Sequence, residues 1–243
     1  MWGLAATGSH GGRIESDLSL YPATNKKKKD MKKIGLVMVM LATAVFASAQ
    51  EKSADEYKNE GNAFVRSKDF ASALASYKQA LTLWGDSVDE ATVFNAGMCA
   101  QKTKEYDQAY AFYAQSEQLG YKAAEAAYRM TQILKVQKKT DEYEAAIKAG
   151  YEKYPNGKTG SFFKKDYAKV IRDKAFKLYN EGAEITKAMQ TAKADKVDDL
   201  KAEAKAKFEA ALPIVDESLT INPDDANAKQ IKDGIEKQIA ALQ

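Results

Sequence analysis

The segment ADEYKNEGNAFVRSKDFASALASYKQALTLW, residues 54–84, decides the fold because it carries two apolar stripes of helical spacing. Small and aromatic side chains recur three and four positions apart in each half: Ala54, Tyr57, Gly61 and Phe64, then Phe70, Ala73, Tyr77, Ala80 and Trp84. This spacing predicts one apolar face on each of two helices. Only Ser67, Lys68 and Asp69 separate the stripes, so the helices should form an antiparallel hairpin. We expect Gly61 and Ala73 to let the two backbones approach, with aromatic rings at the flanks.

The same pattern returns twice along the chain. Tyr57, Gly61, Phe70, Ala73, Tyr77 and Ala80 are followed 36 residues later by Val93, Gly97, Tyr106, Ala109, Tyr113 and Ser116. A further 34 residues along come Thr131, Tyr143, Ile147 and Gly150. A single hairpin cannot bury both of its faces, so such units must stack. We therefore predict a region over residues 50–157 with three repeats, at 54–87, 90–123 and 124–157.

The pattern changes after Gly157. Residues 158–243 predict a longer fourth helical pair, with a first helix beginning near Phe162 and a turn near Ala194 and Asp195. An alternative is that this stretch holds two poorly matched units, because Pro155 and Pro223 lie 68 residues apart, twice the 34-residue period. Asp224 or Asp225 is placed to cap a final helix over 226–242, whose charged outer face suits the end of a stack.

The period, the alternation of small and aromatic residues and the turn that closes each unit resemble tetratricopeptide repeats. The stretch from Tyr57 to Phe64 is similar to a first helix of that family, whereas Tyr143 stands in the third unit where a small alanine is usual. The resemblance implies an all-α, right-handed solenoid of antiparallel helix pairs, here with a longer C-terminal hairpin and a capping helix.

The resemblance also implies a concave groove, lined by the first helices of successive pairs, that holds a protein or peptide partner. The groove residues expected by this analogy are Lys58, Asn62, Val65, Arg66, Asn95, Met98, Gln101, Lys102, Tyr128, Arg129 and Gln132. Their mixed apolar and basic character suits a peptide with an acidic or carboxylate end. Some co-chaperone members clamp a partner's C-terminal carboxylate with lysine, asparagine and arginine side chains. Lys58, Asn62, Asn95 and Arg129 match four such positions, and Glu125 reverses the charge of the fifth.

The N-terminal region predicts export. Lys32 and Lys33 precede the apolar run 34–46, and Ala47-Ser48-Ala49 follows it. A charged start, a short apolar core and a small-residue site indicate a signal peptide over 31–49, with cleavage between Ala49 and Gln50 and a periplasmic product. The apolar core is shorter than the ~20 residues of a membrane span, although an uncleaved anchor or a buried helix remains the alternative. Residues 1–30 are expected to be disordered or not translated; in the latter case translation starts at Met31.

Composition argues against catalysis and nucleic-acid binding. The chain has 37 basic and 34 acidic residues, but residues 50–243 hold 30 and 31, so they offer no basic footprint for nucleic acid. The one histidine, His10, precedes the expected cleavage site, and Cys99 falls inside a predicted helix. We expect no enzyme activity, cofactor or metal site, and no stable membrane insertion after cleavage.

The sequence predicts a non-enzymatic scaffold for protein or peptide partners; the alternative is a self-associating structural protein of the cell envelope. The oligomeric state stays open.

Overall fold

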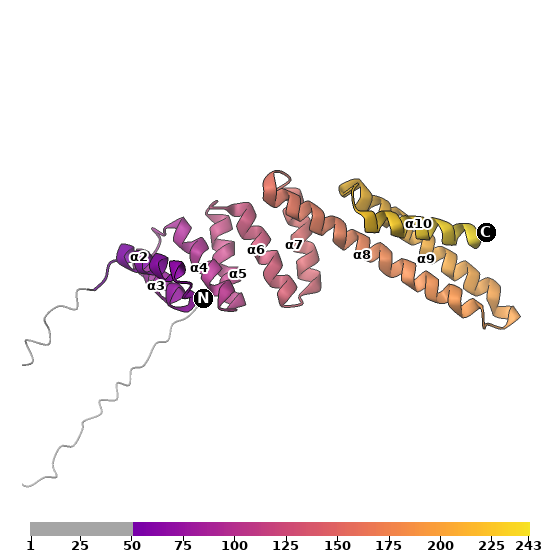
Figure 1. The fold of residues 1–243 in the computed structure, drawn as a ribbon, viewed down its shortest axis with the longest axis horizontal. Helices are drawn as coiled ribbons and strands as arrows, with labels where there is room; N and C mark the ends of the chain where they lie inside the picture. The colour runs from indigo at the N-terminus through magenta and orange to yellow at the C-terminus, as the bar shows by residue number, and fades with distance from the viewer. Residues whose placement is uncertain (1–50) are drawn as a thin grey trace, which may run out of the picture. The chain divides into compact units, whose positions relative to one another are not determined.

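The computed structural model describes residues 51–243, and every regular element within that range is an α-helix. The expected extension over 1–30, the signal peptide and its cleavage site lie outside the described residues. The helices are α2 (Ala54–Arg66), α3 (Phe70–Trp84), α4 (Glu90–Lys102), α5 (Tyr106–Gln118), α6 (Ala123–Val136), α7 (Thr140–Lys153), α8 (Gly157–Met189), α9 (Ala194–Ile221) and α10 (Ala226–Ala241). Consecutive helices pack against one another and form a solenoid of antiparallel pairs (Figure 1).

The three short hairpins α2–α3, α4–α5 and α6–α7 share one turn geometry. A lysine with positive φ stands in the middle of each turn: Lys68 at 62°, Lys104 at 66° and Lys138 at 59°. The next backbone N–H then donates to a carbonyl five residues back, as from Asp69 to Phe64 at 2.9 Å and from Glu105 to Ala100 at 2.8 Å. A left-handed residue closed by this hydrogen bond ends a helix and reverses the chain within three residues. The repeated turn therefore gives the hairpins the same register.

A glycine–aromatic contact joins the helices of a pair. A Cβ added at Gly61 would lie 2.5 Å from the ring of Tyr77, one at Gly97 3.1 Å from Tyr113, and one at Gly182 2.8 Å from Phe208. The space beside Gly61 is filled by the ring of Tyr77, which is 1% exposed. A missing Cβ leaves room for a flat ring to lie directly against the helix, which buries more apolar surface than backbone contact would.

The third pair fills this position differently. Thr131 stands where the first two pairs have glycine, and Ile147 stands where they have tyrosine, both almost fully buried. The glycine contact moves to the boundary with the next helix, where a Cβ on Gly150 of α7 would overlap the ring of Phe163 of α8. Within the third pair, Thr131 is larger than the glycine it replaces and Ile147 is smaller than the tyrosine it replaces. The two changes compensate each other and keep the core close-packed.

The helices α8 and α9 form the long C-terminal hairpin, with bounds that differ from the prediction. Helix α8 begins at Gly157 rather than near Phe162, because Gly157 adopts a φ of 75° and starts the helix directly after the turn. The turn lies at 190–193, before the expected Ala194 and Asp195. Asp195 belongs to the first turn of α9, where its carboxylate interacts favourably with the positive end of the helix dipole.

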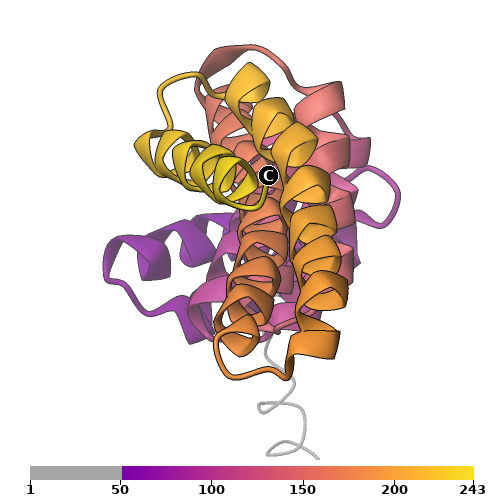
Figure 2. The ribbon, with the colours of Figure 1, turned by 90° about the vertical axis from the view of Figure 1, so that its right-hand side faces the viewer.

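The last helix, α10, is capped by Asp225, as expected. The Asp225 carboxylate accepts hydrogen bonds from the backbone N–H groups of Asn227 at 3.0 Å and Ala228 at 3.2 Å. Its other oxygen lies 3.0 Å from Nη1 of Arg172, and both side chains are largely buried. The pair therefore holds the start of α10 against α8, and the helix crosses the α8–α9 hairpin (Figure 2).

We expect Gly61→Ala to lower the free energy of unfolding by about 1–3 kcal/mol, the usual cost of overpacking a core. The new methyl group would meet the Tyr77 ring, which is held in place by a hydrogen bond from its hydroxyl to Asn62 at 2.8 Å. Chemical denaturation would measure the change.

Gly234→Ala is the matched control. Its Cβ would lie 3.2 Å from the hydroxyl of Tyr179, a partly exposed side chain that can move aside. We expect a change below about 0.5 kcal/mol, because the gain in helix propensity offsets the contact. Equal effects of the two substitutions would contradict the glycine–aromatic packing.

Candidate functional site

A cavity of about 380 Å³ opens where α4, α6 and α8 meet. It lies on the first helices of successive pairs, which the predicted groove also uses. The cavity is lined by Gln101 of α4, by Glu125, Tyr128, Arg129 and Gln132 of α6, and by Lys158, Thr159 and Phe162 of α8. Four of the eleven predicted groove residues are therefore brought together here: Gln101, Tyr128, Arg129 and Gln132.

The polar side of this cavity is held by a short hydrogen-bond network. Nη2 of Arg129 lies 3.1 Å from Glu125, and its Nη1 donates to Oε1 of Gln101 at 3.5 Å. The same Gln101 oxygen accepts from the hydroxyl of Tyr113 at 3.0 Å. Glu125 balances the charge of Arg129, whereas Lys158 forms no ion pair within residues 51–243. The lining therefore keeps one net positive charge, with guanidinium and amide donors at fixed positions.

The apolar side consists of aromatic rings. The ring of Tyr128 lies 5.4 Å from that of Phe162 and 5.2 Å, edge-on, from that of Phe163. The Tyr128 hydroxyl donates to Oδ2 of Asp166 at 3.0 Å. Burial, reinforced by the neighbouring Asp166 carboxylate, raises the pKa of Tyr128 well above its usual range, so this hydroxyl stays a donor at physiological pH. Phe162 is 38% exposed and offers the open part of the aromatic surface.

The other seven predicted groove residues lie outside this cavity. Lys58 is paired with Asp89 at 2.7 Å, and Asn62 accepts the Tyr77 hydroxyl. Val65 and Met98 pack against the buried core, and Lys102 lies over the ring of Phe70 at 6.0 Å. Arg66 is exposed at the end of α2, and Asn95 is half-buried in α4. Of the clamp-like positions, Lys58 and Arg129 are therefore already paired with carboxylates.

Sequence reasoning missed the contribution of α8, namely Lys158, Thr159 and Phe162. It placed the helix start near Phe162, which left Lys158 and Thr159 outside the predicted helix. The signal was present in the turn Pro155-Asn156-Gly157, after which Lys158 and Phe162 stand four residues apart on one helix face. The ammonium group of Lys158 lies 5.9 Å from the centre of the Phe162 ring.

Cys99, the one cysteine of residues 51–243, lies in the helical core. The thiol of Cys99 is fully buried, and burial raises its pKa to about 11, which leaves it protonated at neutral pH. Within residues 51–243 no three His, Cys, Asp or Glu side chains gather in a way that could hold a metal ion. Over the same residues, no helix is both long and apolar enough to span a bilayer.

No protein-family model matches the chain, and the comparison with curated proteins found no match. Among solved structures, it is similar to a tetratricopeptide-repeat protein from Bacteroides fragilis, with a TM-score of 0.56 and 22% identity over 77% of this chain and 99% of that one. A looser likeness is to YrrB, a tetratricopeptide protein with an unusual peptide-binding site, with a TM-score of 0.42 and 17% identity over 76% of this chain and 94% of that one. The first likeness shows the fold: the chain is an all-α solenoid of tetratricopeptide type, as its sequence predicted.

Proposed function

We propose that this protein is a non-enzymatic scaffold that holds a segment of another protein against α4, α6 and α8. The observation that supports this most is the cavity itself, which has an aromatic floor at Tyr128 and Phe162 beside the guanidinium of Arg129, which donates to Glu125 and to Oε1 of Gln101. Apolar pockets with a few convergent polar groups are the usual form of binding sites. The tetratricopeptide fold adds support by analogy, since fold alone does not determine function.

The chemistry of the lining suits a polypeptide. An apolar side chain of the partner can rest on the Phe162 ring, and its backbone carbonyls or carboxylates can accept hydrogen bonds from Arg129, Gln132 and Lys158. Arg129 is already held by Glu125 and Gln101, so little side-chain freedom is lost when a partner binds.

Chemical crosslinking in intact cells, followed by mass spectrometry, tests the scaffold. We expect crosslinks to other proteins, and we expect Phe162→Ala to reduce their yield at least tenfold, because loss of a central aromatic contact costs about 2 kcal/mol or more. Leu119→Ala is the matched control: Leu119 is 37% exposed, close to the 38% of Phe162, but lies at the end of α5 outside the cavity. Its crosslinks should be unchanged, and both variants should melt as the parent does.

Two outcomes would reject the scaffold. Recovery of self-crosslinks alone would favour the self-associating structural protein instead. Equal yields from the parent and Phe162→Ala would place any partner elsewhere on the molecule.

We further propose that the protein acts in the periplasm after removal of residues 31–49, the segment with a charged start, an apolar core and Ala47-Ser48-Ala49. N-terminal sequencing of protein recovered from the periplasm should find Gln50 first, in part cyclised to pyroglutamate. Replacing Ala49 with a bulky residue should leave the precursor uncut. Mature protein that starts at Met1 or Met31 would contradict export.

A further inference from the structure

A stripe of basic and aromatic residues runs along one face of α8, beyond the cavity just described. Lys158, Phe162, Lys165, Lys169 and Phe176 follow one another at steps of four, three, four and seven residues, which keeps them on the same side of the helix. All five side chains are exposed. At a rise of 1.5 Å per residue, Phe162 and Phe176 stand about 21 Å apart along the helix axis.

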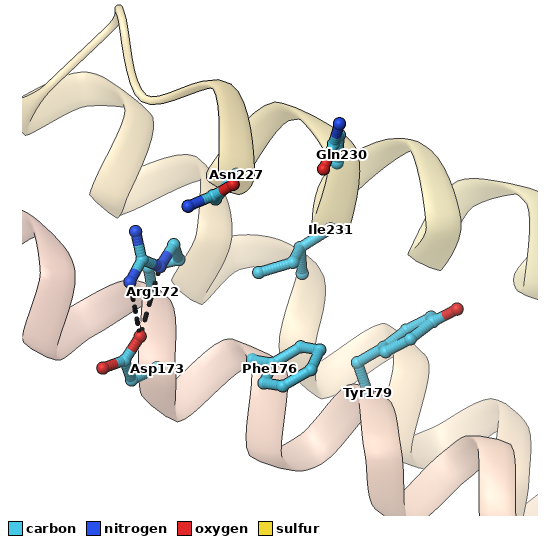
Figure 3. A pocket seen from close by; sticks show the side chains of 7 residues that line it. All are labelled: Arg172, Asp173, Phe176, Tyr179, Asn227, Gln230 and Ile231. Atoms are coloured by element: carbon cyan, nitrogen blue, oxygen red, sulfur yellow. Dashed lines mark hydrogen bonds and ion pairs between the residues drawn. The ribbon is translucent and has the colours of Figure 1, made fainter.

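A second cavity, of about 410 Å³, lies at the far end of this stripe, between α8 and α10. Its lining comes from Arg172, Asp173, Phe176 and Tyr179 of α8, and from Asn227, Gln230 and Ile231 of α10. Figure 3 shows Ile231 pointing from α10 toward Phe176. The rings of Phe176 and Tyr179 stack at 6.3 Å, and Phe176 remains 45% exposed. The two cavities thus present one open phenylalanine each.

The charge between the two cavities is basic and largely uncompensated. Residues 157–177 contain seven basic side chains and two acidic ones. Arg172 is paired with Asp173 and Asp225, and Lys174 is paired with Glu144. Lys165 and Lys169, by contrast, form no ion pair with any residue from 51 to 243. Lys165 and Lys169, four positions apart on the helix surface, repel each other, and Asp166 and Asp173, three and four positions from Lys169, offset only part of this positive charge.

We propose that the α8 stripe binds an extended acidic segment of a partner protein, with one apolar side chain in each cavity and carboxylates on Lys165 and Lys169. A span of about 21 Å corresponds to roughly six residues of extended chain. The segment's carboxylates would relieve the repulsion between the lysines and form charge-assisted hydrogen bonds with them. This inference rests on the proposed scaffold function, because the first cavity is shared.

Random 12-residue peptides displayed on phage and selected on the full chain provide the probe. The selected peptides should be enriched in Asp and Glu and should carry two apolar residues about six positions apart. Synthetic versions with a fluorescent label then give affinities by fluorescence polarisation. Binding should weaken as salt is raised, because the contacts on α8 are solvent-exposed.

The deciding comparison is between two variants with the same change in charge. Lys165→Glu with Lys169→Glu reverses the stripe, and we expect it to weaken binding at least tenfold. Lys164→Glu with Lys177→Glu changes exposed lysines that lie on other sides of the same helix, and it should weaken binding less than threefold. Phe176→Ala should weaken binding severalfold, and circular dichroism should show that all variants remain helical.

Four outcomes would overturn the proposal. The first is selection of no peptide or of peptides without acidic enrichment, and the second is an equal loss from both lysine variants. The third is a change in sedimentation which shows that the α8 stripe is an interface between two copies of this chain. The fourth is a peptide that no longer binds the Phe162→Ala variant but still binds the variant with Lys165→Glu and Lys169→Glu. This result would reject binding along the α8 stripe and leave the scaffold function intact.

Discussion

The contact between a glycine on one helix and an aromatic ring on its partner underlies the packing of this protein. Tyr77, Tyr113 and Phe208 each lie against a glycine of the neighbouring helix, and each ring is almost fully buried. Burying such a ring contributes about 2–3 kcal/mol, and only a missing Cβ provides the space. The contact also fixes the axial position of one helix on the other, since a ring can enter only where the glycine lies.

The candidate binding face follows from this packing. When each pair has the same register, the first helices α4, α6 and α8 are brought side by side, and their outward residues form one surface. Gln101, Arg129 and Lys158 come from three different helices but line a single cavity. In the α2–α3, α4–α5 and α8–α9 pairs, the second helix carries the ring that lies against a glycine of the first helix. Polar groups and Phe162 stand on the outward side of the first helices.

Much of this fold could be predicted from sequence because the residue patterns that determine its helices and turns are local. The three- and four-residue spacing of apolar residues predicts each helix, and the break at Ser67-Lys68-Asp69 predicts the first hairpin. Asp225 could be identified as a cap for the same reason. The bounds of α8 were wrong at its start, because the left-handed conformation of Gly157 is not encoded by apolar periodicity.

The candidate site was less accessible to sequence reasoning, because it depends on contacts between distant segments. The Tyr128 hydroxyl meets Asp166 across 38 residues, and Arg172 meets Asp225 across 53. No local sequence pattern indicates contacts between residues so far apart in the chain. Both the α8 side of the first cavity and the whole second cavity were therefore missed. Family analogy supplied Tyr128 and Arg129, but it did not show that Lys58 is already paired with Asp89.

Hydrogen–deuterium exchange, with and without a bound peptide or crosslinked partner, tests most directly whether the first helices form the binding face. We expect slower exchange in α4, in α6 and in the first half of α8, with α5 and α7 unchanged. Slower exchange confined to α5 and α7, around Tyr110 and Lys153, would place the partner on the opposite helices and contradict the account.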